Sequence, residues 1–383
     1  MVRLFFVLHT IYRGNGVNIR RLLLVISAAV AVRCAADTAW VVHPGSSATK
    51  YPLLQTCRNG KHHELDVEWI ARGKYPALRV RDRNSAVFAG INTKGLALIQ
   101  MAGDPHRDPN PKLTPRTHTG GRLLVSLLTR CASAKEAVET VRASVKSGRF
   151  FGGCIYLVAD TREAHVVECS PRHFSTWQLP HSFCVYANSW KLPGMDDAST
   201  ADAERAKYLY QKEWIVRRAL LKAMRRPGGI TTRAAMAASR LNVEESQKMA
   251  THNGKGAPLP VTAAVGDKYA YGSVLFAIDG DYPALLSCAY LALGHQRRVI
   301  YLPLPLGAAE EILKDGAFLK AAANARRATK LENGFSDNFV KVKSAAKALL
   351  DKGDEAGAKK LLVDMVKQNL AVLATQATPA GGK

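Results

Sequence analysis

The feature that most restricts the fold of this chain is the placement of its short strand-like runs. Apolar and β-branched runs bounded by turn residues occur at 38–43 (TAWVVH) and 51–57 (YPLLQTC), and again within residues 154–190 and 272–306. Runs of this length and composition predict β-strands. These runs are divided between early and late parts of the chain.

Helical spacing separates these strand clusters. Residues 121–147 and 199–226 have apolar residues at helical intervals, and Ser133 with Glu136 predicts a capping box at a helix N-terminus. The segment from about 307 to 375 is rich in Ala and Lys and also has helical spacing. Strand clusters around helix clusters indicate an α+β fold made of packed layers.

Residues 1–36 have the composition of an export signal. They contain five Arg and no Asp or Glu, and a pair of arginines precedes the apolar run 22–32. This run is long enough for a secretory signal but too short to span a membrane. We expect cleavage after Ala36, which leaves Asp37 as the new N-terminus, with Ala31 as the alternative position. The mature protein is therefore predicted to be periplasmic or extracellular and to have no transmembrane span.

The net charge of +23 falls to +18 when the five arginines of the signal are removed. Lys and Arg are scattered along the chain, and no nucleic-acid-binding module is recognisable, so we expect no nucleic-acid partner. A basic exported protein can instead associate with an anionic envelope surface. The sequence does not indicate an oligomeric state.

The sequence predicts neither a metal nor a cofactor. Six cysteines follow the signal without any CxxC spacing, which argues against a zinc ribbon, and most are expected to be buried as small apolar side chains. Cys154 and Cys169 lie in two of the predicted strands. The sequence does not decide whether they form a disulfide or only pack as apolar side chains. The stretch HHELD at 62–66 has no spacing typical of a metal site, and we interpret it as a solvated loop.

Several motifs, taken in order, resemble the Ntn-hydrolase superfamily. They are TAWVVHPGSSATKYPLLQTCRN, FAGINTKGLAL, VVECSP, YANSWKLPG and FAIDGDYPALLSCAYLALGHQRRVIYLPLPL. The chain is most similar to the branch with acyl-CoA:isopenicillin-N acyltransferase-like proteins, choloylglycine hydrolases and secreted dipeptidases. The resemblance implies a four-layer αββα sandwich over residues 37–306, followed by a C-terminal helical extension at 307–383.

The resemblance also implies a chemistry. An N-terminal cysteine attacks the amide carbonyl of a small amide, acyl-amino or peptide substrate, the C–N bond breaks, and the chain's own α-amino group serves as the base. The resemblance implies that Asn188 in YANSW is the oxyanion residue. Asn92 matches a turn beside the substrate pocket, where it is expected to shape the backbone.

The N-terminal motif departs from the family's pattern. Without gaps, Asp37 takes the place of the nucleophilic cysteine, and the Arg-Asn-x-Asp-like motif aligns with TCRN at 56–59. In this alignment Thr56 occupies the position of the family's basic residue, and Asn59 occupies the position of its acidic residue. Arg58 is expected near the pocket. A carboxylate is a poor nucleophile toward an amide. The motifs that shape the fold are therefore retained, whereas the residues that perform the family's chemistry are replaced.

Three hypotheses follow. The chain is a non-catalytic relative that binds a small molecule, or Cys34 is the nucleophile after cleavage at Arg33, or Cys57 acts from the strand beside Asp37. Cys34 lies three residues upstream of the aligned position, roughly 10 Å in an extended chain. Cys57 is placed near Asp37 by a hairpin centred near Ser47. The sequence leaves open whether the protein is an active cysteine-type amide hydrolase or acyltransferase.

Overall fold

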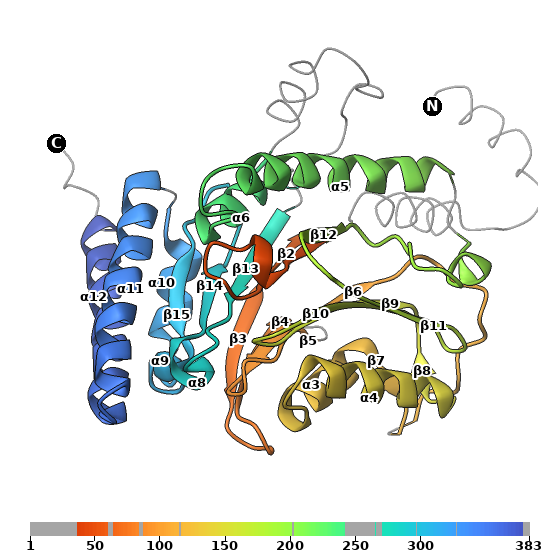
Figure 1. Cartoon of the computed structure of the whole chain (residues 1–383), viewed down its shortest axis with the longest axis horizontal. Coiled ribbons are helices and arrows are strands. Elements are labelled where there is room, and N and C mark those ends of the chain that lie inside the picture. Colours follow the sequence, from red (N-terminus) through yellow and green to blue (C-terminus); the bar gives the residue numbers. More distant parts are fainter. Residues whose placement is uncertain are drawn as a thin grey trace, which may run out of the picture. The chain divides into compact units, whose positions relative to one another are not determined.

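The computed structural model describes residues 37–377 except 60–63, 84–86, 115, 201–202, 242–264, 266–269, 296 and 327. The predicted signal at 1–36 lies outside the described residues, as does Cys34. Residues Asp37–Lys383 form one compact unit. In the compact unit two antiparallel sheets face each other, and helices cover their outer faces (Figure 1).

The first sheet has six antiparallel strands. In spatial order they are β12 (Phe183–Tyr186), β1 (Thr38–Val42), β2 (Leu53–Asn59), β13 (Ala270–Ala277), β14 (Cys288–Ala292) and β15 (Leu302–Pro305). β1 and β2 form the hairpin predicted from TAWVVH and YPLLQTC, and the 3-10 turn η1 (Pro44–Ser46) lies in their link. The pairing of β2 with β13 joins the two distant strand clusters of the sequence.

The second sheet has seven antiparallel strands. In spatial order they are β11 (Phe174–Gln178), β10 (Ala164–Cys169), β9 (Cys154–Ala159), β6 (Ala97–Ala102), β5 (Val87–Asn92), β4 (Ala77–Asp82) and β3 (Leu65–Ile70). A short parallel pair, β7 (His118–Thr119) and β8 (Phe150–Phe151), lies apart from both sheets.

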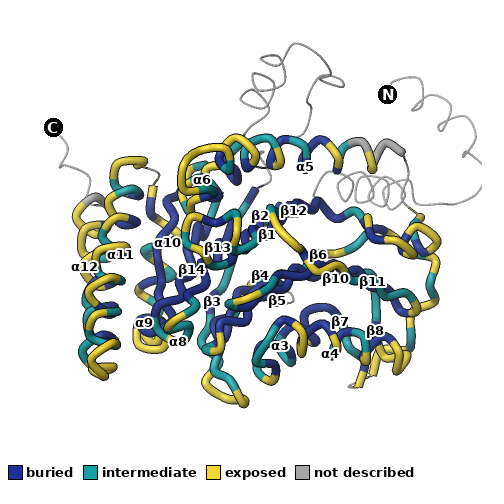
Figure 2. Tube along the Cα trace, viewed as in Figure 1, coloured by how far each residue is buried: buried dark blue, intermediate teal, exposed yellow. Residues whose placement is uncertain are grey.

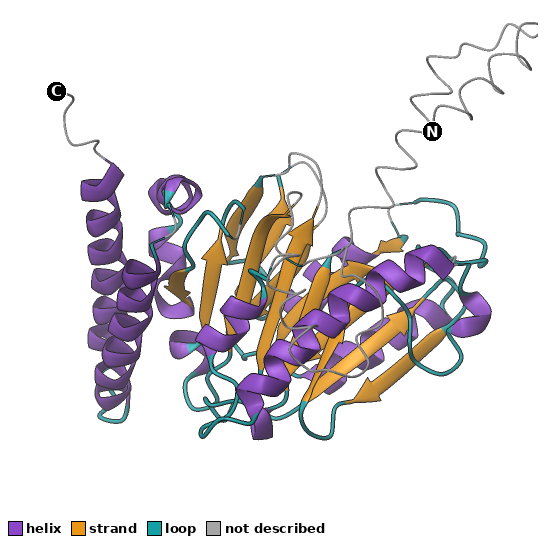
Figure 3. Cartoon of the chain, turned by 90° about the horizontal axis from the view of Figure 1, so that it is seen from above, coloured by secondary structure: helices purple, strands orange, loops and turns teal. Residues whose placement is uncertain are grey.

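Helices form the two outer layers. α3 (Gly120–Arg130) and α4 (Ala134–Lys146) pack on the second sheet, whereas α5 (Ala203–Met224) and α6 (Thr232–Ala238) pack on the first. The short η2 (Asp196–Ala198) precedes α5. The view in Figure 3 shows the strands of the sheets with helices beside them. The chain is thus an αββα sandwich, which confirms the predicted fold class.

Local sequence explains the start of α4. The Ser133 hydroxyl accepts a hydrogen bond from the Glu136 N–H at 3.2 Å, as the capping box predicts. The Glu136 carboxylate, however, accepts from the Ala132 N–H at 2.6 Å, one residue before the predicted partner. One strand prediction was too long, because the start of ALLSCAYLAL forms the short helix α8 (Pro283–Leu286). Proline at the first helical position favours this local turn.

The apolar side chains divide into two main layers. One buried cluster includes residues of both sheets and of the helices on the first sheet, and a second lies between the second sheet and α3 with α4. Figure 2 shows most strands buried and the exposed segments mainly on helices and loops, whereas the outer strands β3 and β11 are largely intermediate or exposed. Strands buried on both faces explain why their sequences are nearly continuous apolar runs rather than alternating ones.

The C-terminal extension consists of helices beside the β15 edge of the first sheet (Figure 1). They are α9 (Leu306–Ile312), α10 (Ala317–Asn324), α11 (Thr329–Leu350) and α12 (Glu355–Ala377). Phe339 of α11 packs edge-on against the buried Tyr290 of β14, with ring centroids 6.0 Å apart. α11 and α12 form a hairpin whose turn contains Gly353 at φ 82°, a conformation that glycine adopts without strain. Among the described residues, none of the helices is both long and apolar enough to cross a membrane.

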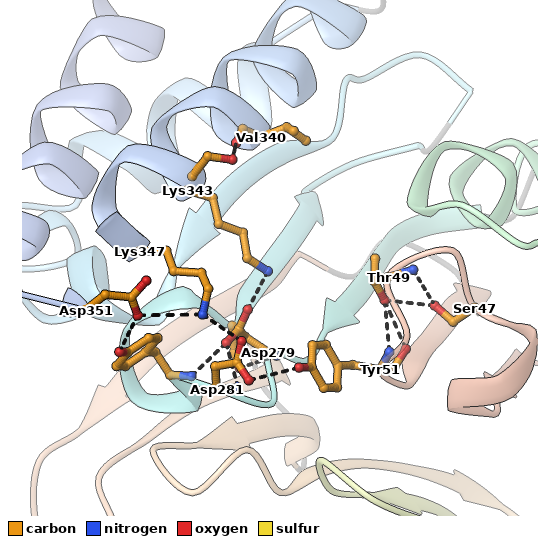
Figure 4. A network of polar contacts seen from close by, with 12 residues as sticks. Ser47, Thr49, Tyr51, Asp279, Asp281, Val340, Lys343, Lys347 and Asp351 are labelled. Carbon is orange, nitrogen blue, oxygen red and sulfur yellow. Dashed lines mark hydrogen bonds and ion pairs between the residues drawn. The ribbon is translucent and has the colours of Figure 1, made fainter. Parts of the chain in front are cut away.

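A polar network fastens α11 to the turn between β13 and α8 (Figure 4). Lys343 pairs with the buried Asp279 at 2.7 Å, and Lys347 pairs with Asp281 at 2.8 Å. The Tyr51 hydroxyl donates to Asp281 at 3.1 Å, which adds the β1–β2 link to the same network. The extension is therefore joined to the sandwich by charge as well as by apolar packing.

Candidate functional site

The candidate site lies where β1 begins and β2 ends. The register pairs Thr38 with Cys57, so Asp37 lies opposite Arg58 at the open end of the hairpin. Side chains of successive strand residues point to opposite faces. Asp37 and Arg58 accordingly face the space between the two sheets, whereas Cys57 faces the helices that cover the first sheet.

Asp37 forms a nearly buried charge cluster. One carboxylate oxygen forms an ion pair with Arg58, and the other accepts a hydrogen bond from the Asn59 N–H at 3.0 Å. Arg58 also donates to Asp82 of the second sheet at 2.9 Å, and the Tyr271 hydroxyl donates to the same carboxylate at 2.7 Å. The cluster therefore ties the two sheets together at this end.

A β-bulge turns a phenylalanine toward this cluster. Val80 pairs with Ala89 and Arg81 pairs with Val87, which leaves Phe88 as the extra residue of β5. The Arg58 guanidinium lies over the Phe88 ring, 4.4 Å from its centroid. A bulge can re-aim a side chain in this way, and a cation over an aromatic face is attracted to it. Arg58 is thus held both by carboxylates and by a ring.

Burial governs the electrostatics of the cluster. It raises the pKa of Asp37, because a carboxylate loses hydration there, and the nearby Arg58 and the Asn59 N–H only partly offset this effect. Burial by itself lowers the pKa of Arg58, but the carboxylates of Asp37 and Asp82 outweigh it and hold that pKa above its ordinary value. Arg58 therefore remains charged, and Asp37 is the group of the pair that titrates.

Asn188 lies on the other side of Asp37. β12 pairs with β1 so that Tyr186 lies opposite Ala39, and continuing this register by two residues sets Asn188 opposite Asp37. Asn188 has φ 66°, a left-handed conformation that asparagine tolerates better than most residues. Its amide nitrogen donates to the Ala102 carbonyl at 2.7 Å, while its buried Oδ1 has no hydrogen-bond partner among the described residues.

Carboxylates from other elements hold the segment around Asn188. Glu213 of α5 accepts hydrogen bonds from the Ala187 N–H and the Ser189 hydroxyl, both at 3.0 Å. Its second oxygen forms an ion pair with Lys191 at 2.5 Å. One helix residue thereby fixes the backbone on both sides of Asn188.

Two more acids complete this support. Glu168, fully buried on β10, accepts hydrogen bonds from the Lys191 and Leu192 N–H groups at 2.8–2.9 Å, and burial raises its pKa. Asp104 accepts from the Trp190 N–H at 3.1 Å. These three acids were not predicted from the sequence. Glu168 carried the only signal, because an acid inside the apolar run VVECS requires a polar partner once it is buried.

Cys57 is packed away from the Asp37 cluster. It is fully buried, its sulfur lies 3.6 Å from the Ser273 hydroxyl, and burial raises the pKa of its thiol to about 12. The β1–β2 pairing does bring the backbone of Cys57 close to Asp37. The side chain that shares a sheet face with Asp37, however, is that of Arg58. The thiol is therefore protonated at neutral pH, whereas a nucleophile needs the thiolate.

Asn92 belongs to a turn. Its amide nitrogen donates to the carbonyls of Leu128 and Cys131 at 2.9 and 2.8 Å, and its oxygen accepts from the N–H groups of Lys94 and Leu96. These bonds occupy the donors and acceptors of the side chain. Asn92 thereby joins the β5–β6 turn to the end of α3. Asn59 contributes its backbone N–H to Asp37.

The described cysteines are all unpaired, including Cys154 and Cys169, which lie directly opposite each other on β9 and β10. Within the same part of the chain, no three His, Cys, Asp or Glu side chains gather in a group suited to a metal. The prediction of a solvated loop for HHELD was partly wrong, because Asp66 lies on β3 and pairs with Arg81 on β4. Glu64 precedes β3 and pairs with Arg83, just after β4.

No protein-family model and no curated protein sequence matches the chain. Among solved structures, penicillin V acylase from Agrobacterium tumefaciens is similar with 13% identity and a TM-score of 0.42, covering 71% of this chain and 87% of the acylase. A variant of conjugated bile acid hydrolase from Clostridium perfringens is similar with 11% identity and a TM-score of 0.42, covering 70% of this chain and 92% of the hydrolase.

Proposed function

We propose that this chain is an exported protein of the Ntn-hydrolase superfamily that binds a small amide, acyl-amino or peptide ligand without cleaving it. The ancestral activity in this proposal is hydrolysis or acyl transfer at a C–N amide bond. Export rests on the composition of residues 1–36. The family assignment rests on the ordered sequence motifs together with the αββα architecture.

One observation carries the non-catalytic part of the proposal. Asp37, at the position aligned with the nucleophilic cysteine, is engaged by Arg58 and by the Asn59 N–H. The nearest thiol in the sheet register, Cys57, is buried on the other face with a raised pKa. A carboxylate in an ion pair and a protonated thiol are both poor nucleophiles.

The same site supports an amide as the ligand. The buried Oδ1 of Asn188 accepts no hydrogen bond from a described residue, and a buried acceptor without a partner is costly. In the proposed complex an amide N–H of the ligand donates to this oxygen. The carboxylates around residues 187–192 hold Asn188 ready for such a ligand.

The first experiment reads the N-terminus and the intact mass of the exported protein, before and after treatment with an amide probe that carries a thiol-reactive group. A chain that begins at Asp37 with no labelled cysteine supports the proposal. A chain that begins at Cys34 with that residue labelled establishes the displaced nucleophile instead, and labelling of Cys57 establishes an active site on β2. Cys34→Ser and Cys57→Ser variants identify the labelled residue.

Binding is tested on the same protein with a panel of neutral N-acetyl amino acid amides and dipeptide amides. We expect Asn188→Ala to weaken binding by about tenfold, because one hydrogen-bonding amide is lost in a buried site. Asp281→Asn, at the far end of the sheet, is the matched control and leaves binding unchanged. Equal affinities for the two variants exclude Asn188 as a ligand contact.

A further inference from the structure

A groove of about 350 Å³ lies in the C-terminal extension, between α10 and α12. Its lining residues are Ala317, Lys320, Ala321, Asn324, Ala325, Arg326, Leu370, Leu373 and Ala374. The volume lies in the range of small-molecule sites. α10 and α12 are direct neighbours in the extension, and none of the residues at the Asp37 site lines the groove.

The sequence of the two helices explains why space remains between them. Ala317, Ala321 and Ala325 follow one another at intervals of four, so they lie on one face of α10 and its C-terminal end. Leu370 and Leu373 of α12 provide larger apolar surface in the same groove. The alanine methyl groups are too short to fill the space, and an apolar slot results.

The charged residues of the groove have one sign. Lys320 and Arg326 are exposed, and the lining residues include no carboxylate. Neither cation forms an ion pair with another residue in the described part of the chain. The neighbouring acid Glu311 on α9 is paired with Lys367 at 2.8 Å. An apolar slot that carries two unpaired cations is complementary to an apolar ligand with an anionic end.

We propose that this groove binds a monocarboxylate with a linear alkyl chain. The chain lies along Leu370, Leu373 and the alanine face of α10, and the carboxylate reaches Lys320 and Arg326. Burial of methylene groups supplies affinity, and the two cations fix the orientation of the ligand. This site is separate from the Asp37 site and does not depend on the function proposed there.

The test is isothermal titration calorimetry of the full chain with hexanoate, octanoate and decanoate below their micellar concentrations. Each added methylene should lower the Kd by about fourfold, from the transfer free energy of a CH₂ group. Decan-1-ol, which keeps the chain but lacks the charge, should bind about tenfold more weakly than decanoate. A Kd that does not depend on chain length overturns the proposal.

Two pairs of variants locate the site. Ala321→Phe fills the groove and should abolish decanoate binding, whereas Ala323→Phe, on an exposed part of α10 outside the groove, should not. The double variant Lys320→Ala/Arg326→Ala should weaken decanoate binding about tenfold and leave decan-1-ol unchanged, with Lys314→Ala as the control. Melting temperatures show that each variant is folded.

Other occupants give distinct results. If Ala321→Phe leaves decanoate binding intact but converts a dimer into a monomer in sedimentation, the groove is a subunit interface and the proposal fails. If the protein binds vesicles of dioleoylphosphatidylglycerol but no monomeric decanoate, the cations act on a membrane surface and the proposal also fails. Retained decanoate affinity in the double cation variant excludes the carboxylate contact.

Discussion

Two clusters of acids and bases lie at opposite ends of the same strands. The first cluster, Asp37–Arg58–Asp82, lies where β2 ends. The second contains Asp279 and Asp281, in the turn that follows β13 and lies beside the start of β2. At the first end the Arg58 and Asp37 side chains are only 15% and 11% exposed. At the second, Lys347 and Asp281 are 42% and 51% exposed. A cation–carboxylate pair is therefore nearly buried at the first end and solvent-exposed at the second.

The pKa directions show what this difference does. Burial raises the pKa of Asp37 in spite of its arginine. Hydrogen bonds from Lys347 and Tyr51 lower the pKa of Asp281, where little hydration is lost. The first cluster is thus a costly arrangement that persists because each charge has a partner, whereas the exposed Lys347–Asp281 pair of the second costs and contributes little. A costly buried cluster at a sheet end is typical of a functional site.

The largest expected effect comes from Arg58→Met. This change leaves Asp37 and Asp82 facing each other in a buried space without a cation, and it should lower the free energy of unfolding by about 3–5 kcal/mol. Denaturation in urea measures the loss. Adding Asp37→Asn and Asp82→Asn to Arg58→Met should restore most of the stability. A small loss for the single variant would show that water or a rearrangement solvates the two acids.

Asp279→Ala should have an intermediate effect. The carboxylate of Asp279 is 5% exposed, pairs with Lys343 and accepts the N–H groups of Asp281 and Tyr282 at 3.1 and 2.7 Å. Its removal should cost about 2 kcal/mol in urea denaturation. Asp279→Asn retains an acceptor for the two N–H groups and should cost less. Equal losses for both variants would mean that the ion pair, and not the turn, carries the energy.

The dependence of stability on pH should have opposite signs at the two ends. The folded-state pKa of Asp37 is raised above its ordinary value of 3.8, so its contribution is full below that value and is lost as pH rises through the raised pKa. Asp281 has a lowered pKa, so its contribution is present above 3.8 and is lost as pH falls through the lowered value.

Urea denaturation of the wild type, Asp37→Asn and Asp281→Asn from about pH 3 to about pH 7 measures this contrast. The difference between wild type and Asp37→Asn should fall with rising pH, and the difference for Asp281→Asn should rise. Slopes of the same sign would remove the distinction between the two clusters.

The smallest effect is expected from Lys347→Met. Its ion pairs with Asp281 and Asp351 are solvent-exposed, so the free energy of unfolding should change by no more than the error of the measurement. Salt should have no effect on the difference between this variant and the wild type. A marked loss would show that the fastening of α11 stabilises the whole sandwich.

Much of the architecture could be predicted because it depends on local patterns. The β1–β2 hairpin and the α4 capping residue Ser133 each follow from residues that are close in sequence. The order of strand and helix clusters predicted the layers. The proximity of Asp37 to the end of β2 also followed from the hairpin. The identity of its partner did not, because a shift of one residue exchanges the two faces of a strand.

The residues that define the candidate site were decided by tertiary structure. Arg58 meets Asp82 across two sheets, and Glu213 of α5, Glu168 of β10 and Asp104, just after β6, converge on one short segment. Nothing in their local sequence specifies these partners. The sequence by itself determined most of the strands and helices and the order of the layers, because side-chain periodicity acts over a few residues. Only the folded chain decided which charges are buried together, because desolvation and pairing depend on groups that are distant in sequence.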